Sequence, residues 1–431
     1  MYRKFYGVLE EWEDKKTKEP LLVTGARQVG KTWIIKKFCS ERYNDHLYLN
    51  FESEPGLSDI FEESLEPYEI LKKIGIYKGR KIDVSTALFF DEIQKCEKAI
   101  TSLKYFCEAE ENYRIIGAGS LLGVKINRFS GSFPVGKIRQ VRMYPMDFEE
   151  FLMATGEELL AEEIESAYKA MKPMPGIIHE KAIHLYRDYL YVGGMPRCVD
   201  NYISSNCDVT SFDRELQHFI LLAYSSDMSK YTTSAAEGVK IAAVYESVPR
   251  QLAKENPKFK YKEVRSNANK RDFYEPIDWL RSSGMVYKVD NTETIRTPLK
   301  LYADDKSFKL YMSDAGLLSY AGKMKYSDLL NTSDNLFKGA LAENYVVQSL
   351  AAKGHELLYH KPDAGLEIDL LLDMPEGIIP VEIKAGRHKR SASLKKYREK
   401  YKPEKAIRIS ENNFGETEGI CSVPLYAAFC L

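Results

Sequence analysis

The chain has 431 residues, with 62 Lys and Arg against 63 Asp and Glu, so its formal net charge is −1. At about 150 residues per domain, this length predicts roughly three domains. The near balance of charge argues against a polybasic, tail-type binder, although a local basic patch remains compatible with it. A hydrophobic content of 44%, including 12% aromatic residues, excludes a wholly disordered chain, because there is ample apolar surface to bury.

The predicted compartment follows from features that the sequence lacks. No run approaches the roughly 18 uninterrupted apolar residues of a membrane-spanning helix, so we expect no association with a membrane. The N-terminal residues turn acidic and aromatic where a signal peptide needs an apolar core. Seven cysteines without a C-x-x-C pair favour a reduced, cytoplasmic protein, and the histidines show no spacing typical of a zinc site.

Short β-like runs alternate with helix-like segments in the N-terminal third of the chain. The β-like runs are residues 20–25, 46–52, 86–92, 114–120 and 137–146. The clearest helical segment between them is 98–110. Strands that alternate with helices in this way form βαβ units, and these build a mostly parallel sheet covered on both faces. We therefore predict an α/β domain over residues 1–150.

The rest of the chain divides by pattern into three further segments. Residues 151–235 contain long helical stretches and no obvious strand, which predicts a helical subdomain. Residues 236–300 read as helices followed, after Ser-Ser-Gly, by a β-like run, and this order suits a winged-helix unit. Residues 301–431 return to mixed α/β, with a strong helix at 336–354 and strands after it.

A glycine-rich loop lies between the first predicted strand and the first predicted helix of the α/β domain. It reads G-x-x-x-x-G-K-T and consists of Gly25, Ala26, Arg27, Gln28, Val29, Gly30, Lys31 and Thr32, followed by Trp33. Its glycines let successive backbone N–H groups point at phosphate oxygens, with the helix N-terminus behind them. Lys31 would reach the β- and γ-phosphates of ATP, and the Thr32 hydroxyl would ligate Mg²⁺.

Two carboxylates end an apolar strand 60 residues after this lysine. The strand Leu88-Phe89-Phe90 is followed by Asp91 and Glu92. Asp91 is placed to hold the hydration shell of Mg²⁺, and Glu92 to orient or deprotonate the attacking water. Beside the glycine-rich loop, this pair predicts hydrolysis of ATP as well as binding.

These two elements, followed by Arg114-Ile115-Ile116-Gly117-Ala118-Gly119-Ser120, resemble the Walker A and Walker B motifs of an AAA+ ATPase core. The resemblance implies that Ser120 helps to position the water, although a plain turn residue fits equally. It also implies assembly into a homo-oligomer, with an arginine finger supplied to a neighbour. Arg128, Arg139 and Arg142 are the candidates for this finger. In the turn Tyr191–Arg197, Arg197 resembles a second sensor that contacts nucleotide, with an ordinary surface arginine as the alternative.

A second set of charged residues that could form a site lies near the C-terminus. Glu382 and Lys384 project to one face of a strand, and Glu367 and Asp369 share one face of the strand before it. Glu343 falls within an apolar helical stripe, where a carboxylate is costly unless it is paired or bound to metal. A solvated ion-pair face is the alternative interpretation of the E-x-K strand.

The pattern Glu…Asp…Glu-x-Lys resembles the restriction-endonuclease-like PD-(D/E)xK nuclease superfamily. This resemblance implies that Asp369 and Glu382 ligate Mg²⁺ with support from Glu343, and that Lys384 orients the water. Over nearly its whole length, the chain resembles a widespread prokaryotic family that joins an AAA+ ATPase domain to an uncharacterised domain of nuclease-like fold. The resemblance therefore implies an α/β ATPase core with a helical lid and a nuclease-like tail.

Two basic clusters lie downstream of the ATPase motifs. The first, with Phe259 and Tyr261 interleaved, contains Arg250, Lys254, Lys258, Lys260, Lys262, Arg265, Lys270 and Arg271; the second contains Arg387, Lys389, Arg390, Lys395, Lys396, Arg398, Lys400 and Lys402. Such clusters neutralise the phosphates of nucleic acid, although solvated helix faces are the alternative. The sequence thus predicts an ATPase that uses ATP and Mg²⁺ and acts on DNA. The rival hypothesis is a nucleotide-controlled switch or scaffold whose inactive nuclease-like domain binds a protein partner.

Overall fold

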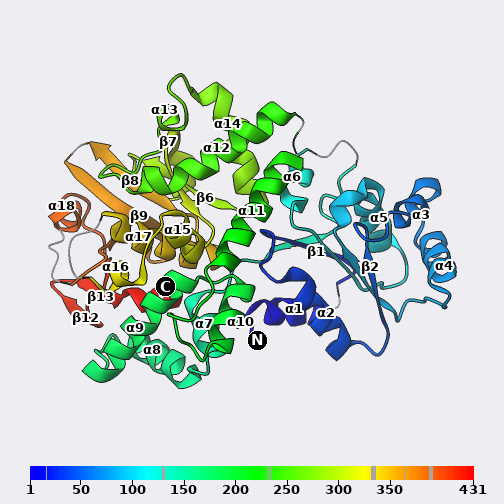
Figure 1. The fold of residues 1–431 in the computed structure, drawn as a ribbon, viewed down its shortest axis with the longest axis horizontal. Helices are drawn as coiled ribbons and strands as arrows, with labels where there is room; N and C mark the ends of the chain where they lie inside the picture. The colour runs from blue at the N-terminus through cyan, green and yellow to red at the C-terminus, as the bar shows by residue number, and fades with distance from the viewer. Residues whose placement is uncertain are drawn as a thin grey trace. The chain divides into compact units, whose positions relative to one another are not determined.

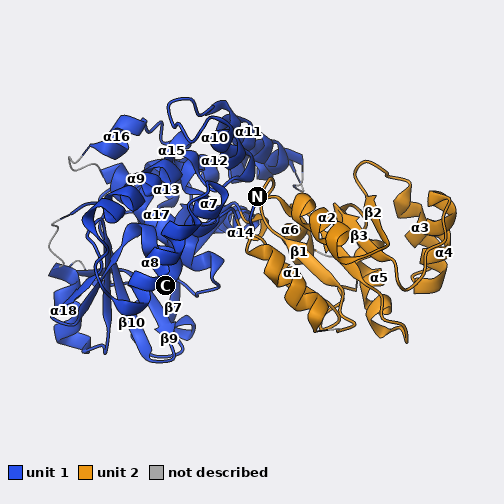
Figure 2. Ribbon diagram, turned by 90° about the horizontal axis from the view of Figure 1, so that it is seen from below, with its two compact units in different colours: residues 1–2, 145–281, 285–431 blue, residues 3–144, 282–284 orange. Residues whose placement is uncertain are grey.

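The computed structural model describes the chain except for a few short gaps. The described residues are 1–15, 17–128, 132–230, 232, 234–331, 336–363, 365–387 and 392–431. They divide into two compact units (Figure 2): unit 1 comprises residues 1–2, 145–281 and 285–431, and unit 2 comprises residues 3–144 and 282–284. No described helix combines the length and apolar composition needed to cross a membrane.

Unit 2 is the predicted α/β domain (Figure 1). Its strands are β1 (Leu21–Thr24), β2 (His46–Asn50), β3 (Ala87–Asp91), β4 (Ile115–Ala118) and β5 (Arg139–Arg142). Its helices are α1 (Phe5–Asp14), α2 (Lys31–Arg42), α3 (Leu57–Glu63), α4 (Pro67–Lys78), η1 (Ile93–Lys95), α5 (Glu97–Glu108) and α6 (Leu122–Asn127). The strands pair in the order β2-β3-β4-β1-β5, all in parallel. All five predicted strands and the parallel sheet are confirmed.

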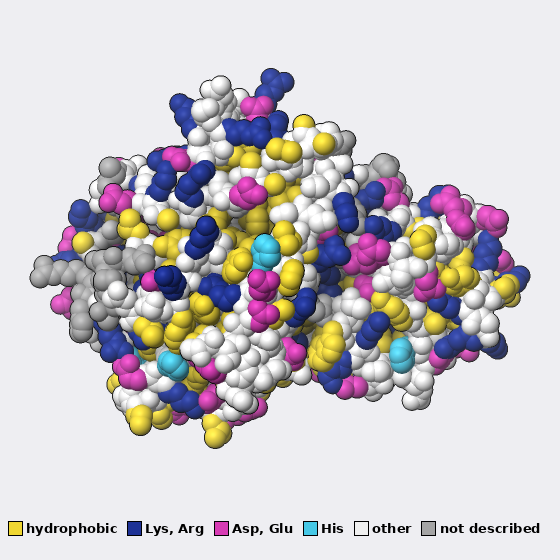
Figure 3. Space-filling model, in the orientation of Figure 1, with side chains coloured by type: hydrophobic (Ala, Val, Ile, Leu, Met, Phe, Trp, Pro, Cys, Tyr) yellow, Lys and Arg dark blue, Asp and Glu magenta, His cyan; other side chains and the backbone are white. Residues whose placement is uncertain are grey.

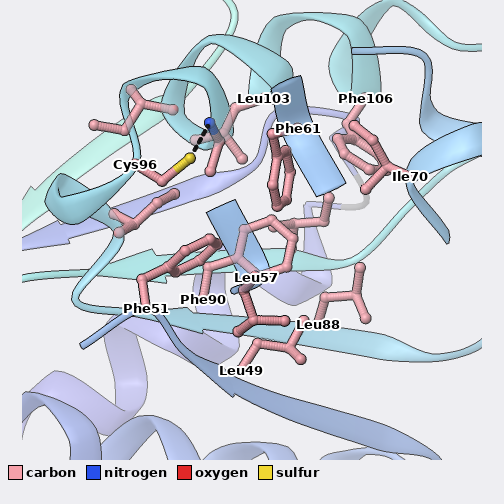
Figure 4. Close-up of a cluster of buried hydrophobic side chains, with 14 of the residues drawn as sticks. Leu49, Phe51, Leu57, Phe61, Ile70, Leu88, Phe90, Cys96, Leu103 and Phe106 are labelled. Atoms are coloured by element: carbon pink, nitrogen blue, oxygen red, sulfur yellow. Dashed lines mark hydrogen bonds between the residues drawn. The ribbon is translucent and has the colours of Figure 1, made fainter. Parts of the chain in front are cut away.

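The core of unit 2 explains why its central strands, β1, β3 and β4, are continuous apolar runs. Leu49 of β2 and Leu88 and Phe90 of β3 point toward apolar side chains from α3, α4 and α5 (Figure 4). The Phe61 ring of α3 lies edge-on to Phe90, with 6.0 Å between the ring centroids. Because helices cover this face, the strand residues are buried, and the sheet holds the loops at its carboxyl edge in fixed positions.

Unit 1 begins with the predicted helical region. It contains α7 (Phe148–Ala154), α8 (Glu158–Ala170), α9 (Gly176–Val192), α10 (Pro196–Ser204), α11 (Glu215–Lys230) and α12 (Ala235–Leu252). No strand interrupts the described residues between α7 and α12. The helical prediction for 151–235 is therefore confirmed as secondary structure. An Asp147 capping box begins the first of these helices, in which the Asp147 side chain accepts a 2.8 Å hydrogen bond from the Glu150 amide.

The remainder of unit 1 is a mixed sheet with helices packed on it. Its strands are β6 (Val286–Thr292), β7 (Ala303–Met312), β8 (Leu358–Asp363), β9 (Leu366–Met374), β10 (Gly377–Ile383), β11 (Ala406–Ser410), β12 (Gly415–Thr417) and β13 (Ile420–Pro424). They pair in the order β12-β13-β11-β10-β9-β8-β6-β7. The helices are α13 (Tyr261–Val264), α14 (Lys270–Ser283), η2 (Leu299–Tyr302), α15 (Ala315–Ala321), α16 (Tyr326–Leu330), α17 (Leu336–Ala352), α18 (Ala392–Tyr401) and η3 (Leu425–Cys430). Among them, α17 contacts β6, β7 and β10, while α18 contacts β9 and β10.

The separate winged-helix unit predicted for residues 236–300 is not confirmed. The helix ends as expected, with α14 closing at Ser283 and Gly284 adopting a left-handed φ of 81°. The strand after it, β6, pairs with β7 on one side and with β8 on the other. It is therefore an interior strand of the sheet that continues to Pro424. A β-like run of residues predicts a strand, but it does not show which distant strands pair with it.

Candidate nucleotide-binding site

The glycine-rich loop of unit 2 forms a tight turn between β1 and α2. Gly25 and Gly30 have φ values of 140° and 95°, in the region that favours glycine. A Cβ at Gly25 would lie 2.2 Å from the Met143 carbonyl oxygen, so no other residue fits there. The Lys31 ammonium is buried under the loop and donates 2.8 Å hydrogen bonds to the carbonyl oxygens of Gly25 and Ala26. The loop thus holds its lysine inside the turn.

The Walker B aspartate lies directly beside this loop. Thr32 Oγ1 donates a 2.9 Å hydrogen bond to Asp91 Oδ2. Tyr48, on the neighbouring strand β2, donates a second 2.9 Å bond to the same oxygen, and the Asn50 amide donates to the Tyr48 hydroxyl at 2.8 Å. Asp91 is buried at the carboxyl end of β3. The arrangement brings together the hydroxyl and the carboxylate that are predicted to hold Mg²⁺, and their oxygen atoms suit a hard cation.

Glu92 follows Asp91 in a left-handed backbone conformation, with φ 51°. Its carboxylate accepts a hydrogen bond from the amide of Gln94. Burial raises the pKa of Glu92; the Gln94 hydrogen bond and nearby Lys31 act in the opposite direction. A raised pKa makes this carboxylate a stronger base than an exposed one, which suits it to accept a proton from water.

The other predicted residues of this site occupy varied positions. Ser120 is buried just beyond the end of β4, which lies between β1 and β3 in the sheet. Ala26 and Val29 are buried in the loop, whereas Arg27 and Gln28 are partly exposed. The Trp33 side chain is 48% exposed at the start of α2. Ser120 is therefore a buried residue at the end of β4, the strand that pairs with the Asp91 strand, β3.

Two of the candidate finger arginines have neighbours within unit 2. Arg139 forms a 3.3 Å ion pair with Glu11, and the Arg142 guanidinium lies 5.7 Å from the centre of the Tyr144 ring. Arg128 is exposed at the end of α6. The structure therefore separates an exposed candidate from one held by a carboxylate.

The predicted second-sensor turn has a structural role inside unit 1. The Gly194 amide donates a 2.6 Å hydrogen bond to Asp314 Oδ2, and the Leu317 amide donates a 2.9 Å bond to Asp314 Oδ1. A Cβ at Gly193 would lie 2.3 Å from the same carboxylate. These contacts explain both glycines of the turn. Arg197 is exposed in the first turn of α10, and its contact with nucleotide stays a prediction.

The C-terminal charged residues are also brought together within unit 1. The buried Lys309 ammonium lies 2.8 Å from Glu343 and 3.2 Å from Glu367. Asp369 accepts a 2.7 Å hydrogen bond from the Ile383 amide, and burial, with nearby Glu343, raises its pKa to about 7. Lys309 was not singled out by sequence reasoning, because a lysine in a strand is usually exposed.

The E-x-K pair is formed as predicted, with Lys384 Nζ 3.0 Å from Glu382 Oε1. The other oxygen of Glu382, Oε2, is buried without a hydrogen-bond partner among the described residues. Across the described part of the chain, no three His, Cys, Asp or Glu side chains are arranged to hold a metal ion. Glu343 lies beside Lys309 and Glu382 lies beside Lys384, so both carboxylates have a positive charge next to them. Metal binding by Glu343, Asp369 and Glu382 stays a prediction.

The comparisons with known families agree with the geometry of unit 2. Residues 17–152 match an AAA domain. This match, together with the loop and the Asp-Glu pair, identifies the N-terminal region as that of an AAA+-type ATPase. Residues 183–328 and 338–427 match two domains of unknown function, DUF8612 and DUF4143. These two matches assign no activity, so the nuclease-like fold of residues 301–431 stays a prediction.

No curated protein matches the chain. Among solved structures, the Walker-type ATPase PABY2304 of Pyrococcus abyssi is similar, with 12% identity, a TM-score of 0.44, and coverage of 74% of this chain and 95% of that one. The ORC2 protein of Aeropyrum pernix has 11% identity, a TM-score of 0.39, and coverage of 76% and 93%. DnaA from Aquifex aeolicus has 13% identity, a TM-score of 0.29, and coverage of 65% and 89%. Because these TM-scores are below 0.5, the function is inferred from the residues of this chain.

Three residues of the AAA domain site were missed by sequence reasoning. Arg3 is buried and donates 2.7 Å and 2.8 Å hydrogen bonds to the carbonyl oxygens of Val29 and Tyr144. Tyr48 and Gln94 contact Asp91 and Glu92 directly, as described above. The position of Tyr48 on the strand paired with β3 was a usable signal, whereas nothing local marks Arg3 as a support for the loop.

The first basic cluster is exposed on unit 1, but one of its aromatic residues is not. Phe259 is 5% exposed and stacks on Phe308, with 5.2 Å between the ring centroids. It therefore cannot stack on bases, which corrects the prediction of interleaved aromatic contacts. Figure 3 shows Lys and Arg side chains gathered over α13. The exposed members are Arg250, Lys254, Lys260, Lys262, Arg265 and Arg271. In the second cluster, Lys389 and Arg390 lie outside the described residues.

Proposed function

We propose that the protein hydrolyses ATP at the P-loop of its AAA domain. The observation that carries this proposal is the 2.9 Å hydrogen bond between Thr32 and Asp91, with Lys31 buried on one side and Glu92 following Asp91. A phosphate-binding loop, a pair of magnesium-binding oxygens and a carboxylate base are the parts that phosphoryl transfer to water requires. They come from the turn between β1 and α2, the start of α2 and the end of β3.

The roles of the residues follow from these positions. Lys31 leaves the Gly25 and Ala26 carbonyls to bind the β- and γ-phosphates, while the loop amides bind the remaining phosphate oxygens. Thr32 and Asp91 hold Mg²⁺, which neutralises charge on the phosphates. Glu92 accepts a proton from the attacking water, and Ser120 helps to position that water beside the γ-phosphate.

Release of phosphate from ATP by the purified protein tests this proposal. We expect Mg²⁺-dependent turnover that Lys31→Ala abolishes, because the phosphates lose their main cationic partner. The matched control is Lys37→Ala on the same helix, whose lysine forms an exposed ion pair with Glu41. Exposed pairs contribute little, so this variant should retain full activity. Turnover by Lys31→Ala at the wild-type rate would falsify the site assignment.

We further propose that the ATPase acts on DNA. The support is the group of exposed basic side chains around α13, of which Lys260, Lys262, Arg265 and Arg271 form no described ion pair. Basic side chains that neutralise phosphates make binding fall steeply as salt increases. Anisotropy of a labelled DNA duplex, titrated with salt in the presence and absence of ATP, measures this dependence. Weak, salt-insensitive DNA binding together with an ATP-dependent change of protein partner would favour the switch or scaffold.

We also propose that the protein forms a homo-oligomer in which Arg128 completes the site of a neighbouring copy. The support is the exposed position of Arg128 at the end of α6. Sedimentation of the protein with and without ATP measures assembly. Arg128→Ala protein and Lys31→Ala protein should each be inactive alone, and mixing them should restore part of the activity, because the P-loop of one copy then meets the arginine of the other. A mixture that stays inactive would contradict this proposal.

We propose nuclease activity of the C-terminal sheet separately, and its support is the Glu382–Lys384 pair with the partly buried Asp369 on the neighbouring strand. Incubation of DNA and RNA with Mg²⁺ or Mn²⁺ tests it, with Lys384→Ala as the variant. Absence of cutting, or cutting that survives Lys384→Ala, would exclude this role and leave the cluster as a set of buried ion pairs.

A further inference from the structure

Gln94 lies two residues after the proposed base, in the short helix η1, and only one half of its side-chain amide is satisfied. Its Nε2 donates a hydrogen bond to Glu92 Oε2. Its Oε1 has no hydrogen-bond partner among the described residues, although the residue is 6% exposed. A buried acceptor left unpaired costs about 1–3 kcal/mol, so a group that donates to it is expected.

The position of this oxygen is fixed by the neighbouring strand. A Cβ at Gly119 would lie 1.7 Å from Gln94 Oε1 and 2.7 Å from Gln94 Cδ. Gly119 therefore leaves space that the Gln94 amide fills, and Ser120 follows immediately. The Gln94 side chain thus contacts two parts of the proposed site, since its Nε2 bonds to Glu92 and its Oε1 packs against Gly119.

We propose that Gln94 Oε1 accepts a hydrogen bond from the water that attacks the γ-phosphate, while Glu92 accepts the other. A water molecule has two O–H groups, and two acceptors on one side of it direct an oxygen lone pair to the opposite side. The Nε2 bond to Glu92 fixes the two acceptors relative to each other. This inference rests on the proposed ATP hydrolysis and adds a second water-binding residue to it.

The reaction is balanced with the groups named. The water oxygen forms a bond to the γ-phosphorus as the bond from that phosphorus to the β,γ-bridging oxygen breaks. ADP keeps the electron pair of the broken bond. The proton that the water loses passes to the Glu92 carboxylate and then to solvent, and Gln94 gains and loses no proton.

Three variants test the inference through the split between turnover and binding. Gln94→Met keeps the size of the side chain and removes both amide contacts. Gly119→Ala keeps the glutamine at position 94 but displaces its side-chain amide, since the new methyl group would overlap Oε1. Gly56→Ala is the control, because a Cβ at Gly56 meets nothing within 4 Å.

We expect kcat for ATP hydrolysis to fall on the order of 100-fold in both Gln94→Met and Gly119→Ala. KM and ATP affinity should stay near those of wild type and Gly56→Ala in both variants, and the unfolding temperature should stay near that of wild type in Gln94→Met. If kcat is unchanged in an active protein, the inference is overturned while the proposed function stands. If kcat and the unfolding temperature of Gln94→Met fall together, Gln94 is a structural residue only. If wild type itself hydrolyses no ATP, the proposed function and this inference both fail.

Discussion

The hydroxyl of Thr32 and the carboxylate of Asp91, 59 residues apart in the chain, are joined by a 2.9 Å hydrogen bond. One residue begins the helix after β1 and the other ends β3, so the bond connects two elements on either side of β4 in the sheet. The two groups that would hold Mg²⁺ are thus already together, and metal binding needs no large rearrangement of these strands.

Tyr48→Phe is expected to weaken this arrangement. The variant removes one of the two hydroxyl donors to the buried Asp91 carboxylate, and the Asn50 amide loses its acceptor. Hydrogen bonds to charged groups contribute about 1.5–3 kcal/mol, so the free energy of unfolding should fall by a similar amount. Denaturation by urea measures the loss. Tyr68→Phe is the control, because the Tyr68 side chain is exposed; an equal effect of both variants would contradict the assignment.

Lys309→Met is expected to destabilise unit 1 strongly. The lysine is almost completely buried between Glu343 and Glu367, and its removal takes the counter-charge from the partly buried Glu343 and one of two counter-charges from Glu367. Breaking a buried ion pair in this way costs about 3–5 kcal/mol. The control is Lys361→Met, which removes a partly exposed partner of the same Glu367 and should cost under about 1 kcal/mol. If chemical denaturation shows the same loss in free energy of unfolding for both variants, burial of the lysine does not determine that loss.

Asp314 predicts a pH dependence of stability. Burial raises its pKa to about 6 in the folded protein, despite hydrogen bonds from the Gly194 and Leu317 amides. The unfolded pKa is about 3.9, so the folded state holds the proton more tightly. The resulting stability is fully present below pH about 4 and is lost as the pH rises through about 6. The loss is about 3 kcal/mol. The Asp314→Asn variant lacks this titration, so calorimetric unfolding between pH 4 and 7 should show wild type losing stability relative to the variant as the pH rises; parallel curves would refute the prediction.

Neutralising the exposed basic side chains near α13 should weaken DNA binding through the salt-dependent part of the affinity. In the triple variant Lys260→Ala, Lys262→Ala and Arg265→Ala, the slope of log K against log salt should become shallower by about 2–3. The control variant changes three exposed lysines elsewhere, Lys72, Lys81 and Lys172. An equal change of slope in both variants would mean that binding follows total charge and not this surface.

The fold of unit 2 was predictable from its sequence because its signals are local. The strands β1, β3 and β4 are short apolar runs, and the spacing of Gly25, Gly30 and Lys31 identifies the phosphate-binding loop. The same locality explains the confirmed end of α14 at Ser283, where Gly284 follows. Tyr48 and Arg3 were missed because their partners, Asp91 and Val29, lie far from them in the chain.

The sheet of unit 1 was only partly predictable, for the same physical reason. The residues of β6 predict a strand, but its pairing with β8 depends on residues 68 positions later in the chain. The residues around Lys309 do not distinguish it from an exposed lysine in a strand. Only the fold places it between Glu343 and Glu367. The burial of Phe259 against Phe308 likewise depends on the packing of distant segments.

Hydrolysis of ATP by wild type and Glu92→Gln, measured beside ATP binding, tests the central claim most directly. We predict that wild type releases phosphate and that Glu92→Gln binds ATP with similar affinity. The variant should release phosphate at least about 100-fold more slowly, because the base is lost while the P-loop, Thr32 and Asp91 remain. Turnover by Glu92→Gln at the wild-type rate, or no turnover by wild type, would contradict the account.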